Sequence, residues 1–211
     1  MLNWMEYLKI FVAITVILDP LVAVPTFINL TSGEPKRNRA RIAFVTSFAV
    51  FILLSGAALV GDFLLNILGI SISAFRVAGG ILLLLMAISM LQAKVPSSKQ
   101  TPEETHEAED KETIAVVPLA IPLLAGPGSI STMIVYSNHS ASLIHKLILC
   151  LISFTVSIIV WVVLRLSSRI GIALGTSGIN VATRLMGLLL AAFGVEFIAD
   201  GFIGLFPRLF Q

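Results

Sequence analysis

An aspartate and two prolines interrupt the first long apolar stretch of the sequence, in a pattern that could bind a solute. Asp19 precedes Pro20, and Pro25 follows, in a run that has no other charge from Ile10 to Leu30. A proline within a helix removes one amide donor and displaces the carbonyl group four residues earlier, so that peptide groups are released for a ligand. Burial favours the neutral form of a carboxyl group, and Asp19 could therefore also carry a proton.

A second interruption is predicted at Gly126-Pro127-Gly128, shortly after Pro122. The two glycines tolerate backbone angles that other residues avoid. A helix starting after Gly128 would present the amides of Ser129 and Ile130 at its positive end, which suits a carboxylate. Carbonyl groups freed at the first break would accept an ammonium group, and a zwitterionic amino acid would satisfy both breaks. The expected substrate-binding residues are Asp19, Pro20, Pro25, Asn29, Pro122, Gly126, Pro127, Gly128 and Ser129.

Proton coupling is assigned to Asp19 and to Glu196, because a carboxylate far inside a membrane usually marks an ion or substrate path. Two plainer interpretations stay open. Asp19 could cap the helix that follows it, and the prolines could serve packing alone. Arg76 and Arg184 are expected to extend to opposite membrane surfaces, although either could close a gate by pairing with an acid.

The amino-acid composition indicates that these residues belong to a membrane protein. Of 211 residues, 57% are hydrophobic and only 12% are charged, against about 25% charged in soluble domains, and mean hydropathy is +0.99. A net charge of +2 is too dilute for a nucleic-acid partner. The lone Cys150 excludes an intramolecular disulfide, and neither a metal site nor a cofactor is expected.

Six stretches have about the 20 mostly apolar residues that a membrane-spanning helix needs. The sequence therefore predicts an all-α polytopic membrane protein with six transmembrane helices, of which the first and fourth are broken. The predicted spans are Tyr7–Leu30, Ile42–Gly61, Ile70–Leu91, Ile114–Tyr136, Leu147–Leu164 and Val181–Phe206.

An internal repeat relates the two halves of the chain. Residues 20–25 (PLVAVP) match 122–127 (PLLAGP), and residues 76–79 (RVAG) match 184–187 (RLMG), in the same order. Three spans in each copy make the repeats inverted, an arrangement common in secondary transporters. We expect a single membrane domain over residues 1–211, with repeat one at 5–93, a cytoplasmic loop at 94–113 and repeat two at 114–206.

The positive charges predict the orientation. Ten of the 14 Lys and Arg fall on one side of the six spans, and the positive-inside rule places that side in the cytoplasm and both termini outside it. The ten are Lys36, Arg37, Arg39, Arg41, Lys94, Lys99, Lys111, Arg165, Arg169 and Arg184. His139 and His145 then fall in an external loop.

The chain resembles the MarC family of bacterial inner-membrane proteins over essentially its whole length. The resemblance rests on Asp19-Pro20 with Pro25, on the run VPLAIPLLAGPG from Val117 to Gly128, and on RLMGLLL at 184–190. It implies the inner membrane, a relation to LysE-type exporters, and a carrier for small neutral amino acids, as described for some members. The family name alludes to multiple antibiotic resistance.

These observations favour a proton-coupled secondary transporter, with export as one direction of transport, and with a small amino acid-like substrate and the lipid bilayer as its partners. Self-association into a homo-oligomer stays open. The alternatives are a channel, a structural membrane protein without carrier activity, or an intramembrane hydrolase. The hydrolase fits least well, because the sequence contains no GxSxG or HExxH motif.

Overall fold

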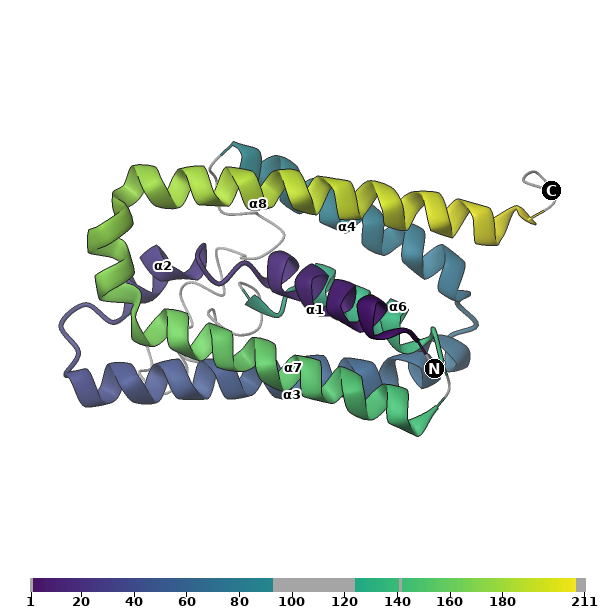
Figure 1. The fold of residues 1–211 in the computed structure, drawn as a ribbon, viewed down its shortest axis with the longest axis horizontal. Helices are drawn as coiled ribbons and strands as arrows, with labels where there is room; N and C mark the ends of the chain where they lie inside the picture. The colour runs from purple at the N-terminus through teal and green to yellow at the C-terminus, as the bar shows by residue number, and fades with distance from the viewer. Residues whose placement is uncertain (1, 93–123, 141, 208–211) are drawn as a thin grey trace.

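The computed structural model describes residues 2–92, 124–140 and 142–207, which form helices and no strands. The helices pack lengthwise into one elongated bundle (Figure 1). Their bounds are α1 Trp4–Leu18, α2 Ala23–Leu30, α3 Lys36–Ile67, α4 Ile72–Leu91, α6 Pro127–Ser137, α7 Leu143–Arg165 and α8 Ser167–Leu205.

The described helices are suited to a membrane. The helices α3, α4, α7 and α8 are each long and apolar enough to cross one, and the bent pair α1–α2 brings the number of spans to five. The fourth predicted span is described only from Leu124 onward, so the first part of that span and the predicted loop at 94–113 lie outside the described residues. The all-helical class and the multi-pass character predicted from composition are confirmed.

The predicted interruption of the first span is present. The axes of α1 and α2 differ by 47° across the four residues between them. Pro20 lies in this break and cannot donate to the carbonyl oxygen of Val16, while Pro25 lies in the first turn of α2, where a missing amide costs little. The break therefore falls at the first proline and not at the second.

Two antiparallel helix pairs frame the bundle, α3 with α7 and α4 with α8. Glycines set the close approach of α4 and α8: a Cβ atom at Gly80 would lie 2.7 Å from the carbonyl oxygen of Gly194. Gly187, Gly194 and Gly201 recur at seven-residue intervals on the side of α8 that faces α4. Such small residues let two membrane helices approach each other closely.

The helix α6 lies between these pairs and packs against α1, α3 and α4. Its residues are buried almost throughout, including Met133 and Val135. They join one apolar core with Ile14, Ile17 and Leu54. A short helix surrounded in this way is held by tertiary contacts and not by its own propensity.

The prediction for the start of the sixth span was wrong. The helix α8 begins at Ser167, 14 residues before the predicted Val181, and changes direction at Gly175, where φ is 60°. Figure 1 shows its first turns crossing the end of the bundle before the long segment runs back along α4. Residues 167–180 contain Ser, Thr, Gly and Asn, so hydropathy alone does not mark them as part of a span although they are helical.

Candidate functional site

The break between α1 and α2 is organised around Asp19. This residue is 2% exposed and is the C-cap of α1, in a left-handed conformation with φ 39° and ψ 74°. Its amide donates to the carbonyl oxygen of Thr15, and its own carbonyl oxygen accepts from Val22. The N-cap of α2 is Val22, which makes no side-chain cap. Asp19 thus ends the first helix, and the formal N-cap position of the second helix belongs to Val22.

The start of α6 is the second candidate element. Gly126 is its N-cap, Pro127 is its first residue, and both Gly128 and Ser129 are buried. The amides of Ser129 and Ile130 donate to the carbonyl oxygen of Gly126 at 3.1 and 3.2 Å. The expectation that these two amides face a ligand was therefore wrong for this conformation, because the helix begins two residues earlier than expected and closes its first turn through them.

The two elements lie at matching depth in the bundle. The helices α1 and α6 are in contact and antiparallel, since Lys9 near the start of α1 and Tyr136 near the end of α6 line the same cavity. Ten residues, or about 15 Å, separate Lys9 from Asp19 further along α1. The same number separates Tyr136 from Gly126 at the start of α6. Geometry thus brings the start of α6 to the level of the first break.

Other residues of the predicted set lie elsewhere. Pro25 and Asn29 are exposed on α2. Asn29 is ten residues beyond Asp19, near the far end of that helix. Pro122 lies outside the described residues. By the same count along α1 and α6, Asp19 and Pro20 lie at about the depth of Gly126, Pro127, Gly128 and Ser129, whereas Pro25 and Asn29 lie farther along α2.

A cavity of about 610 Å³ opens at the end of the bundle where α1 begins and α8 ends. Charges of both signs line it, alongside aromatic and aliphatic groups. The charged and aromatic lining includes Glu6, Lys9, Arg76, Tyr136, His139, Phe193, Glu196, Phe197 and Asp200. Glu196 is the acid that the sequence analysis selected, and Asp200, one turn later on α8, lines the same cavity.

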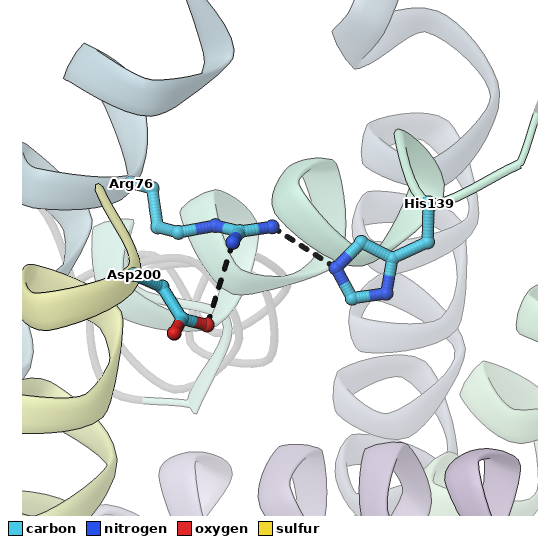
Figure 2. Close-up of polar contacts among 3 residues, drawn as sticks. All are labelled: Arg76, His139 and Asp200. Atoms are coloured by element: carbon cyan, nitrogen blue, oxygen red, sulfur yellow. Dashed lines mark hydrogen bonds and ion pairs between the residues drawn. The ribbon is translucent and has the colours of Figure 1, made fainter. Parts of the chain in front are cut away.

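Arg76 connects the walls of this cavity, as Figure 2 shows. One guanidinium nitrogen lies 3.4 Å from Oδ2 of Asp200, and another lies 3.0 Å from Nε2 of His139. The guanidinium of α4 thus joins α8 to the segment that follows α6. Of the two interpretations offered for Arg76, pairing with an acid is the one present. The side chains of Arg76 and Asp200 are 20% and 52% exposed, so their ion pair contributes less than about 1 kcal/mol.

His139 and His145 have different roles. The pKa of His139 is held below its ordinary value by desolvation of the His139 ring and by the positive charge of Arg76. The ring is therefore neutral at pH 7, and its Nε2 accepts a hydrogen bond from Arg76. His145 was wrongly placed in a loop: it lies on the first turn of α7 and is fully buried. It contacts the hydroxyl of Tyr7 and the carbonyl oxygen of Tyr136 at 3.0 and 2.9 Å, which joins α1, α6 and α7.

The cavity does not reach Asp19. On α1 its lining ends at Val12, seven residues or about 10 Å before the aspartate. The intervening Ile14 and Ile17 are buried, as are Thr132 and Met133 on α6. The conformation is therefore closed between the cavity and the level of Asp19 and the start of α6.

These features define a polytopic α-helical integral membrane protein with a broken first span and a charged cavity at one end. The family described as "MarC family integral membrane protein" matches residues 4–206, and the chain belongs to the MarC family. The family resemblance seen in the sequence is thereby confirmed.

Relatives are found in bacteria and archaea. The UPF0056 membrane protein YhcE of Escherichia coli strain K12 is 39% identical over 205 residues, which cover 96% of this chain and 94% of that protein. A UPF0056 membrane protein of Buchnera aphidicola subsp. Acyrthosiphon pisum is 37% identical over 203 residues, covering 96% and 94%. One of Methanocaldococcus jannaschii is 38% identical over 206 residues, covering 96% and 89%. None of these names describes an enzyme. No solved structure matches the chain.

Proposed function

We propose that the protein is a proton-coupled secondary transporter of small neutral amino acids or similar small solutes. The observation that carries the proposal is the buried carboxylate of Asp19 at a helix break, with the amino end of α6 at the same depth. An intramembrane carboxylate is costly to insert and is usually retained for an ion or substrate path. Half-helices that end near the midplane form the binding sites of many secondary transporters.

The groups at the two breaks suit the two ends of an amino acid. Asp19 and the carbonyl oxygen of Val16, which Pro20 leaves without its helical donor, would receive the ammonium group. The amino end of α6 retains a partial positive charge even when its first amides are bonded internally, and it would attract the carboxylate. Gly128 lets this end pack closely against α4, because a Cβ atom there would lie 2.8 Å from the sulfur of Met86.

The cavity that contains Glu196 supplies an entrance on one side. Its charges of both signs can accept a zwitterion, and Arg76 with Asp200 and His139 forms a contact across its walls that must reorganise when the walls move. We assign Glu196 as the second proton-carrying group, at the mouth of a path that continues to Asp19. The closed layer at Ile14, Ile17 and Met133 would then open in another conformation of the carrier.

An inverted repeat fits this mechanism. The equivalent second helices of the two proposed repeats, α3 and α7, pack together, as do the equivalent third helices, α4 and α8. The proposed repeats are 5–93 and 114–206, joined by a cytoplasmic loop at 94–113. With the basic end of the bundle in the cytoplasm, the cavity at Glu196 faces the periplasm or exterior of a bacterial inner membrane. We also propose that both termini lie on that side.

Counterflow in proteoliposomes tests this function. Vesicles of the purified chain, preloaded with unlabelled alanine, should accumulate labelled alanine transiently and with saturation. A channel would equilibrate the label without an overshoot, and a structural protein or an intramembrane hydrolase would give no flux above empty vesicles. Asp19→Asn should remove stimulation by a pH gradient. The matched control is Asp62→Asn, because Asp62 lies near the end of α3 with Asn138 as its partner.

A further inference from the structure

A second cavity, of about 470 Å³, lies at the opposite end of the bundle, between the start of α3 and the corner where α7 meets α8. Four basic side chains line it, and none of the described residues in its lining is acidic. They are Lys36 and Arg39 of α3, Arg165 of α7 and Arg169 of α8. Like charges gathered in one cavity repel one another, so the arrangement favours an anionic occupant.

Among the described residues, the contacts that the structure shows for Arg39 and Arg165 are with neutral groups and cancel neither charge. Arg39 donates to the hydroxyl of Ser168 at 2.8 Å, and Ser168 is neutral. The guanidinium of Arg165 lies 5.8 Å from the centre of the Trp161 ring, which is also neutral. Neither α3 nor α8 has an acidic residue in its first turn, and neither has a side-chain cap. The amino ends of both helices therefore add to the positive potential.

An apolar groove begins one helical turn from this cavity, along the seam between α3 and α7. Phe44 lies one turn after Ala40 of the cavity, and Trp161 lies one turn before Arg165. The groove holds about 290 Å³ and is lined mainly by exposed aromatic and aliphatic side chains. Phe44, Phe48, Phe154, Ile158 and Trp161 are the exposed ones, and Phe51 is half-buried.

The two hollows follow the same sides of both helices. Lys36, Ala40, Phe44 and Phe48 are spaced by four residues, so they form one stripe along α3. The groove continues to Phe51, eleven residues or about 16 Å beyond Ala40. That length is close to half of the roughly 30 Å hydrocarbon core, which is the thickness that the acyl chains of one leaflet fill.

We propose that this seam binds one anionic phospholipid, with its phosphate in the basic cavity and an acyl chain along the aromatic groove. Basic pockets between membrane helices on the cytoplasmic side bind anionic headgroups, and the continuous apolar groove adds the part of the ligand that a soluble phosphate lacks. The site is separate from the proposed transport path and does not depend on it, since its residues come from the other end of the bundle.

Trp161 provides a direct test, because the chain has only two tryptophans. Trp4→Phe leaves Trp161 as the single emitter. The full chain is reconstituted in phosphatidylcholine vesicles, and its fluorescence is titrated with phosphatidylglycerol brominated on the acyl chains, or with phosphatidylcholine brominated in the same way. We expect phosphatidylglycerol to quench with about tenfold higher apparent affinity. Equal quenching by the two lipids would overturn the proposal.

Charge variants in the Trp4→Phe background locate the effect. Lys36→Gln with Arg169→Gln should reduce the preference for phosphatidylglycerol about tenfold. Arg37→Gln removes a charge from the same turn of α3 but not from the cavity lining, and it should leave the preference largely intact. A preference that survives the double substitution would place the headgroup elsewhere. Circular dichroism verifies that each variant is folded.

A soluble competitor distinguishes the two sources of a phosphate. Inorganic phosphate at millimolar concentration should not restore the quenched fluorescence, because it gains nothing from the groove. If phosphate reverses the quenching in proportion to its concentration, the cavity is a soluble-anion site and the phospholipid is not its occupant.

Discussion

Replacing Asp19 with glycine should stop transport and should leave the protein more stable than replacing Asp19 with alanine. A left-handed conformation costs a residue with a Cβ atom about 1 to 2 kcal/mol, and Asp19 adopts it with φ 39°. Glycine adopts it without strain but loses about 0.5 to 1 kcal/mol through the greater freedom of its unfolded chain. The difference makes the free energy of unfolding of Asp19→Gly higher than that of Asp19→Ala by about 0.5 to 1 kcal/mol. Functional positions commonly retain such strain.

Unfolding of the purified chain in detergent micelles, followed by circular dichroism, measures this change. Asp19→Ala is the matched variant, because it also removes the carboxylate but keeps the Cβ atom in the strained conformation. We expect it to be less stable than Asp19→Gly by about 1 kcal/mol, with neither variant exchanging alanine. If Asp19→Gly is instead destabilised as much as Asp19→Ala, the carboxylate has a structural role and the reasoning fails.

Three further changes test other parts of the account. Gly194→Ala should destabilise the protein by about 1 to 3 kcal/mol, because its Cβ atom would lie within 3.1 Å of the α4 backbone; Gly56→Ala, with nothing within 4 Å, should not. The contact that His139 makes with Arg76 should contribute to stability above pH 6.5 and be lost as the pH falls through the lowered pKa of His139. The measurement compares the stability of the wild type with that of His139→Gln from pH 8 to pH 5. A difference that stays constant over this range would contradict the prediction. Gly128→Leu should abolish alanine exchange in a folded protein. Gly128→Ala should retain part of the exchange, because the sulfur of Met86 can move. Full exchange by Gly128→Leu would show that the start of α6 is not part of the site.

Local chemistry made the breaks and the packing glycines predictable from the sequence. Pro20 removes a donor wherever it occurs in a helix, so the end of α1 at Leu18 followed from the residue type. Gly126 and Pro127 are typical of a helix start, and α6 begins there. The glycines of α8 lie seven residues apart, which places them on one side of a helix whatever the fold.

Features that depend on tertiary structure were not predictable in this way. The bond between Arg76 and His139 joins residues 63 positions apart, and only the packing of α4 against α6 brings them together. The burial of His145 depends on Tyr7 and on the Tyr136 carbonyl group. The first turns of α8 were missed because polar residues in a short helix across the end of the bundle lack the hydropathy of a span.

Proton movement during alanine counterflow tests the central claim most directly. The claim is that Asp19, at the break between α1 and α2, carries a proton together with the solute. Proteoliposomes containing a trapped pH-sensitive dye should show a change of internal pH that depends on alanine with the wild-type protein. Asp19→Asn should exchange labelled alanine without that change. An equal pH change with Asp19→Asn would contradict the claim, as would an absence of alanine-dependent proton movement in the wild type.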